Sequence, residues 1–126
     1  MEPTSQSSTV AEKSKAFAIQ IIRFAQMLRN DKREYTLSKQ ILRAGTSIGA
    51  NIRESKNAQS DLDFISKLSI ALKEADETAY WLELLIGSKL IERPVFDELY
   101  KEVNELIYML TAIIKTKKAN ITNNGS

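Results

Sequence analysis

The chain of 126 residues contains no cysteine and no histidine. Without cysteine it can form no disulfide and offers no thiolate, and without histidine it lacks the commonest general base and the commonest transition-metal ligand. Ser47 therefore has no partner for nucleophilic catalysis. The one metal site that this composition still permits is an all-carboxylate magnesium or manganese site. We expect a protein that is not an enzyme and that binds no cofactor and no metal.

Long apolar runs are also missing. The first residues, MEPTSQSST, have neither the basic start nor the apolar core of a secretory signal. No uninterrupted apolar stretch approaches the roughly 18 residues that a bilayer span requires. These absences predict a cytoplasmic protein without membrane contact.

Residues that interrupt helices are scarce as well. Proline occurs only at positions 3 and 94, and glycine only at positions 45, 49, 87 and 125, so long stretches contain nothing that would end a helix. Thr9 and Glu12 have the spacing of a capping box at the start of a first helix. Four long helices are expected, the third after a Ser60 cap and the fourth with Pro94 at its first position: residues 9–30, 36–57, 60–87 and 94–117.

Short connections between long helices make sequential neighbours antiparallel. The sequence therefore predicts an all-α fold, an up-down-up-down antiparallel four-helix bundle. The bundle domain is expected over residues 9–118, between a disordered N-terminal tail (1–8) and a disordered C-terminal tail (119–126).

Apolar residues around the helix axes predict self-association. The fourth helix has a single apolar stripe, whereas the first and third carry further apolar residues outside theirs. Exposed apolar patches on a protein of this kind usually mark an interface, although the crossing of the helices could also bury them within one bundle. The predicted oligomer interface comprises six residues: Ile19, Ile22, Ile70, Tyr80, Trp81 and Leu84.

Two glycines and a row of polar residues distinguish the second helix. Gly45 and Gly49, one turn apart, each cost the helix about 1 kcal/mol relative to alanine. We therefore expect another helix to approach closely along this side, within the bundle or across a subunit boundary. The polar row and two carboxylates of the third helix are predicted to form a structural polar network that sets helix register: Gln40, Arg43, Ser47, Asn51, Glu54, Glu74 and Glu77.

The charges are unevenly distributed along a chain whose net charge is only +2. Residues 1–60 contain 10 Lys/Arg and 5 Asp/Glu, whereas residues 61–100 contain 4 and 9. Such segregation can create a basic surface for nucleic acid, or it can pair opposite charges between helices or subunits. The candidate nucleic-acid contacts, apart from Arg43 of the predicted network, are Arg29, Lys32, Arg33, Lys39, Arg53, Lys56, Lys115, Lys117 and Lys118.

Two consecutive segments carry a resemblance to a known family. LSKQILRAGTSIGANIRES, followed by SDLDFISKLSIALKEADETAYWLELL, resembles the signature of the "four helix bundle protein" family, whose members are encoded in intervening sequences of bacterial 23S ribosomal RNA genes. The resemblance spans about Lys13 to Lys117. It rests on a specific combination of residues: Gln40, Ser47, Asn51, Glu54, Phe64, Ala71, Glu74, Glu77, Trp81 and Leu82.

The resemblance implies a bacterial source, a four-helix up-down bundle and a ring-like homopentamer. A related group, the accessory proteins of diversity-generating retroelements, forms similar pentamers that bind nucleic acid and a reverse transcriptase through basic surfaces. The net charge of +2 is modest compared with that group.

Two functions remain open at this point. The first is a non-catalytic, homo-oligomeric accessory protein, expected to be pentameric, that binds RNA or DNA. Because the chain has no aromatic RNP-type motif, such binding would rest on phosphate contacts, with weak sequence preference and strong salt dependence. The alternative is an oligomeric protein-interaction scaffold with no nucleic-acid role.

Overall fold

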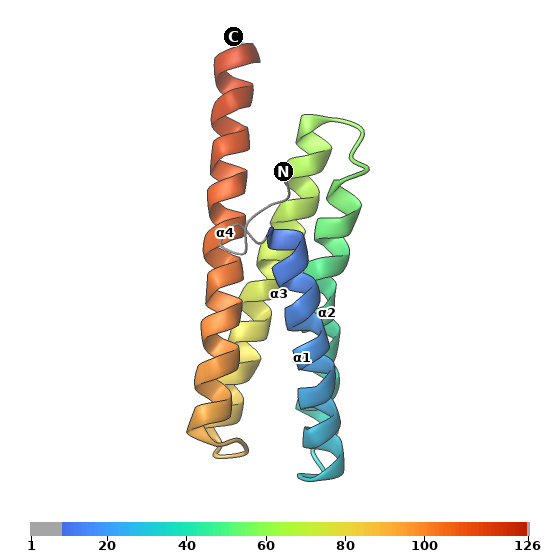
Figure 1. The fold of residues 1–126 in the computed structure, drawn as a ribbon, viewed down its shortest axis with the longest axis vertical. Coiled ribbons are helices and arrows are strands. Elements are labelled where there is room, and N and C mark those ends of the chain that lie inside the picture. Colours follow the sequence, from blue (N-terminus) through green and yellow to red (C-terminus); the bar gives the residue numbers. More distant parts are fainter. Residues whose placement is uncertain (1–8, 126) are drawn as a thin grey trace, which may run out of the picture.

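The computed structural model describes residues 9–125, with side chains to Asn123, and shows a bundle of four helices (Figure 1). The predicted tail 1–8 and residue 126 lie outside the described residues. Each helix packs against the next, and α4 also packs against α1. The predicted all-α antiparallel bundle is therefore confirmed. Its helices are α1 (Val10–Asn30), α2 (Thr36–Ser55), α3 (Asp61–Gly87) and α4 (Arg93–Gly125).

Capping side chains fix the starts of α1 and α3. The backbone N–H of Glu12 donates to the Thr9 hydroxyl, and the N–H of Thr9 donates to the Glu12 carboxylate, each over 3.0 Å. The Ser60 hydroxyl accepts from the N–H of Asp63, also over 3.0 Å. These bonds satisfy backbone donors that a first helical turn would otherwise leave free. Both predicted caps are confirmed.

Helix α4 departs from the prediction at both ends. It begins at Arg93, so Pro94 occupies its second position, and it continues past Lys117 to Gly125. Residues 119–125, expected as a tail, are therefore helical, because neither proline nor glycine interrupts the chain between positions 94 and 125. Figure 1 shows this last part of α4 projecting beyond the ends of α2 and α3. The difference at α2 is smaller, since that helix ends at Ser55 rather than near Asn57.

The two glycines of α2 lie against α1. A Cβ atom added at Gly45 would lie 2.8 Å from a side-chain carbon of Ile21, which is fully buried, and one at Gly49 would lie 3.2 Å from the hydroxyl of Ser14. The predicted close approach is therefore confirmed, and the approaching helix belongs to the same bundle. This contact positions the outer surfaces of α1 and α2 beside each other.

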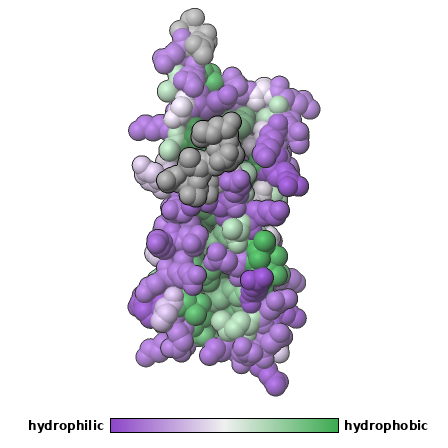
Figure 2. All heavy atoms as spheres, viewed as in Figure 1, coloured by the Kyte–Doolittle hydropathy of each residue, from purple (hydrophilic) through white to green (hydrophobic). Residues whose placement is uncertain are grey.

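The face shown in Figure 2 is mostly polar, with apolar residues gathered in its lower half, where α1 and α4 face the viewer. A shallow hollow between these two helices is lined by Phe24, Val95 and Leu99 together with Gln20, Arg23 and Glu98. The main core, by contrast, is closed and includes fully buried side chains from each helix.

Candidate interaction surfaces

A groove on the outside of the bundle, between α1 and α2, gathers three cations. Its volume is about 400 Å³, and most of its walls are formed by small residues, which allow α1 and α2 to pack closely there. Lys15 comes from α1, Arg53 from the last turn of α2, and Lys56 follows that helix directly. We call this the basic groove; its other lining residues are Ala11, Ser14, Ala18, Thr46, Gly49 and Ala50.

The cations of the basic groove have no counter-ion within residues 9–123. Lys15, Arg53 and Lys56 are exposed and take part in none of the ion pairs found in that part of the chain. Among the described residues, no carboxylate lines the groove either. Three positive charges around a floor of small side chains form a surface that an extended anion can approach closely.

The other predicted nucleic-acid contacts do not join into one surface. Four of them, Arg29, Lys32, Arg33 and Lys39, lie around the connection between α1 and α2. The other three, Lys115, Lys117 and Lys118, belong to the opposite end of the bundle, because the 20 residues of α2 span about 30 Å. Arg29 is engaged locally, with its guanidinium 5.4 Å from the centre of the Tyr35 ring. Sequence reasoning missed Lys15, which joins Arg53 and Lys56 only once α1 packs against α2.

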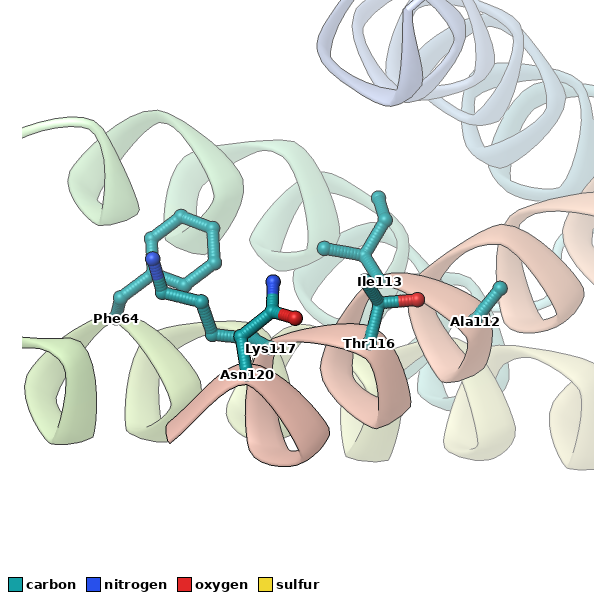
Figure 3. Close-up of a pocket in the computed structure, with 6 residues that line it drawn as sticks. All are labelled: Phe64, Ala112, Ile113, Thr116, Lys117 and Asn120. Atoms are coloured by element: carbon teal, nitrogen blue, oxygen red, sulfur yellow. The ribbon is translucent and has the colours of Figure 1, made fainter. Parts of the chain in front are cut away.

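A pocket of about 350 Å³ lies between the first turn of α3 and the upper part of α4 (Figure 3). The side chain of Lys117 lines one side of this pocket. Its ammonium nitrogen lies 3.0 Å from a carboxylate oxygen of Asp61 and 5.3 Å from the centre of the Phe64 ring. We call this the α3–α4 pocket; it is lined by Phe64, Ala112, Ile113, Thr116, Lys117 and Asn120.

Arg43 forms the centre of a polar cluster between α2 and α3. Its guanidinium donates to Glu74, with 3.2 Å between nitrogen and oxygen, and to Glu77. Desolvation opposes the charge on Arg43, but the two carboxylates outweigh it and raise the pKa of the guanidinium above its ordinary value. Arg43 is therefore held by α3 rather than presented as an unpaired cation.

The other residues of the predicted polar network do not join the side-chain cluster around Arg43. The hydroxyl of Ser47 donates to the carbonyl of Arg43, and the amide of Asn51 donates to the carbonyl of Ser47, both along α2 itself. Asn51 therefore does not join the predicted network with the α3 carboxylates, because its amide donates to a carbonyl one turn back along α2. Glu54 does contact α3, through an ion pair with Lys67 at 3.2 Å. Gln40 makes no side-chain hydrogen bond within residues 9–123.

Most of the apolar residues predicted for an interface are exposed. Ile19 and Ile22 lie one turn apart on α1, and we call them the α1 patch; Ile70, Tyr80 and Leu84 are exposed along α3, and we call them the α3 patch. Tyr80 is the most exposed of the five at 53%. The alternative that one bundle buries all of these side chains is therefore wrong. Trp81 is only partly exposed and packs against the core.

The indole of Trp81 leaves a donor unsatisfied. Its N–H is buried and finds no acceptor in the described part of the chain. Buried polar groups normally have a hydrogen-bond partner, so this position is unusual. The Tyr80 ring lies beside it, with 5.5 Å between the two ring centres.

The comparison with known families decides where this bundle belongs. The family model described as 23S rRNA-intervening sequence protein matches residues 6–112. The chain belongs to this family. A solved structure, that of a protein with unknown function from the S23 ribosomal protein family of Bacteroides thetaiotaomicron, is 52% identical in sequence. It superposes with a TM-score of 0.83 and covers 84% of this chain and 95% of that chain. No curated protein matches.

The 23S rRNA-intervening sequence protein match does not extend over all of the candidate surfaces. The basic groove, the polar cluster and both apolar patches lie within residues 6–112. Thr116, Lys117 and Asn120 lie beyond the matched residues. The α4 side of the α3–α4 pocket is therefore mostly outside the family match.

The described part of this 23S rRNA-intervening sequence protein contains neither a metal-binding cluster nor a membrane-spanning helix. Residues 9–123 contain no cluster of three or more Asp, Glu, His or Cys side chains that could hold a metal ion. None of the helices described is long and apolar enough to cross a membrane.

Proposed function

We propose that this member of the 23S rRNA-intervening sequence protein family is a non-catalytic, homo-oligomeric accessory protein that acts in the cytoplasm and binds RNA or DNA through phosphates. The observation that carries the proposal is the basic groove, where Lys15, Arg53 and Lys56 come together without a counter-ion in the described chain. A phosphate backbone supplies the regularly spaced negative charges that such a groove attracts.

The walls of the groove favour backbone contact over base readout. Alanine, glycine, serine and threonine side chains line it, and none of these is long enough to reach far into a nucleic-acid groove. Lysine and arginine contacts to phosphate position a nucleic acid but carry little sequence information. Binding in the basic groove is therefore expected to depend steeply on salt and weakly on sequence.

Self-association is supported by the two apolar patches. The patches lie on α1 and α3, which occupy diagonal corners of the bundle and do not pack against each other. The helices also differ in charge: α1 has four cations and one carboxylate, and α3 has two cations and six carboxylates. We propose that the α1 patch of one copy packs against the α3 patch of the next, since a head-to-tail contact forms a ring when the rotation between successive copies closes.

The size of the ring follows from the family resemblance, which implies a pentamer. Five chains with a net charge of +2 each would present five basic grooves around one assembly. Several weak phosphate contacts on one particle bind a long nucleic acid more tightly than any one of them does alone.

A protein-interaction scaffold is the second candidate function. It is favoured by the ion pairs that join Arg43 to Glu74 and Lys117 to Asp61, because they neutralise part of the segregated charge within one chain. In that case the basic groove would bind an acidic surface, either of another protein or of a neighbouring copy of this chain.

Fluorescence anisotropy separates the two candidates. Labelled single-stranded RNA, a structured RNA and a DNA control are titrated with the assembled protein at about 50 and 200 mM salt. Saturable binding that weakens steeply with salt is expected for the nucleic-acid role. Absence of binding to all three ligands at the lower salt concentration would contradict it and favour the scaffold.

A further inference from the structure

The basic groove continues over the end of the bundle to the α3–α4 pocket. Lys56 lines both the groove and a hollow beside the connection from α2 to α3. Phe64 and Lys117 line that hollow and also the α3–α4 pocket. The shared residues make the three depressions neighbours along one path, which begins with the unpaired cations and ends at an aromatic ring.

The α3–α4 pocket combines an aromatic face with a polar edge. Phe64 is partly exposed, and Ala112 and Ile113 extend the apolar surface beside it. Thr116 and Asn120 lie one turn apart on α4, and neither side chain has a hydrogen-bond partner within residues 9–123. An asparagine amide offers both donors and an acceptor, and a threonine hydroxyl offers one donor and two lone pairs.

We propose that the α3–α4 pocket binds an unpaired base of a single-stranded nucleic acid whose backbone lies along Lys56 and the basic groove. This inference rests on the proposed function and adds the class of nucleic acid that is bound. The base stacks on Phe64, and its polar edge faces Thr116 and Asn120. Aromatic stacking beside a positively charged track is a general way to bind single strands, and it tolerates different sequences because every base has a π face.

Lys117 occupies the stacking position in the free protein. Its ammonium group lies beside the Phe64 ring, as Figure 3 shows, and is paired with Asp61. The ion pair is exposed on the aspartate side, so its loss costs little. When the base enters, the flexible lysine chain moves off the ring and its charge becomes available to the adjacent phosphate. Asp61 lines the hollow between the groove and the pocket and repels a phosphate there, and Lys117 beside it offsets this repulsion.

A paired base fits this site poorly. In a duplex the base is stacked on its neighbours and its polar edge is occupied by the complementary base, so binding would require that base to be extruded. A single strand presents both the face and the edge at no such cost. The pocket therefore predicts a preference for single strands, whereas the basic groove by itself would bind either form through phosphates.

The test compares a labelled single-stranded oligonucleotide with a strand of the same length in which abasic sites replace the central bases. Three proteins are titrated by fluorescence anisotropy: the wild type, Phe64→Leu and the matched control Tyr108→Leu. The Phe64→Leu variant keeps an apolar side chain but removes the stacking face. Tyr108 is an exposed aromatic residue of α4 that does not line any of the three depressions.

We expect the wild type and Tyr108→Leu to bind the intact strand roughly tenfold more tightly than the abasic strand, and Phe64→Leu to bind both with the lower affinity. Circular dichroism establishes that each variant is folded. Equal affinity of the wild type for the two strands would overturn the stacking site and leave phosphate binding in the groove intact. No binding of either strand by the wild type would overturn the proposed function as well, and would favour a protein ligand for the pocket.

Discussion

Gly45 determines how closely α1 and α2 can pack. The Ile21 side chain fills the space where a Cβ atom at this position would lie, and no part of Ile21 is exposed. Gly87, at the end of α3, has no neighbouring atom within 4 Å of the corresponding position and does not have a positive φ. An added methyl group would therefore clash with Ile21 at Gly45 but would meet no neighbouring atom at Gly87.

Substitution of each glycine by alanine tests this difference. Gly45→Ala is expected to lower the free energy of unfolding by about 1–2 kcal/mol, because overpacking against Ile21 outweighs the gain in helix propensity. Gly87→Ala, the matched control, is expected to raise it by about 0.5 kcal/mol, since alanine restricts the unfolded chain. Urea denaturation followed by circular dichroism measures both values. Equal stabilisation by the two substitutions would show that α1 does not constrain Gly45.

Two residues of the proposed binding sites could not be placed from the sequence. Phe64 is among the residues that carry the family resemblance, but the sequence does not show that its side chain lines a pocket instead of lying fully within the core. Lys15 is an ordinary exposed cation until α2 brings Arg53 beside the same groove. In both cases the deciding information is a contact between helices that are separate in the sequence.

The helices themselves followed closely from local signals. Their caps were predictable because Thr9 and Ser60 precede carboxylate residues at the spacing that caps require. The end of α4 was not predictable. The polar residues after Lys117 resemble a tail, but none of them stops a helix before Gly125. Local composition therefore predicted the capped helix starts correctly, but it did not predict the end of α4, where no stop signal is present.

The outward faces of α1 and α3 carry the head-to-tail contact that we propose. Two variants disrupt one patch each by placing two carboxylates in it: Ile19→Asp with Ile22→Asp, and Ile70→Asp with Leu84→Asp. Each variant alone is expected to be monomeric, with the mass of the 14.2 kDa chain. An equimolar mixture is expected to contain dimers and nothing larger, because the first variant keeps its α3 patch and the second keeps its α1 patch.

Light scattering after size-exclusion chromatography gives these masses. Leu62→Asp serves as the control, since Leu62 is 72% exposed and belongs to neither patch, and it is expected to retain the mass of the wild type. Full assembly by either double variant alone would contradict contact between unlike patches. Persistence of monomers in the mixture would contradict it as well.

Charge segregation along the chain was predictable, but its arrangement in space was not. The sequence places most cations in residues 1–60, whereas the bundle distributes them between two ends and pairs Arg43 with carboxylates of α3. Lys15, Arg53 and Lys56 gather around a single groove and form no ion pair within residues 9–123. The proposal of nucleic-acid binding depends on this group rather than on the net charge.

The salt dependence of RNA binding tests the basic groove most directly. The double variant Arg53→Gln/Lys56→Gln removes two groove cations, and the control Lys73→Gln/Lys101→Gln removes two exposed cations from α3 and α4 that form no ion pair within residues 9–123. The net charge falls equally in both. For the groove variant, we expect the plot of log affinity against log salt to become shallower by about 1–2 units, with weaker binding of every sequence. The control is expected to keep the wild-type slope. Equal slopes in the groove variant and the wild type would contradict phosphate binding in the basic groove.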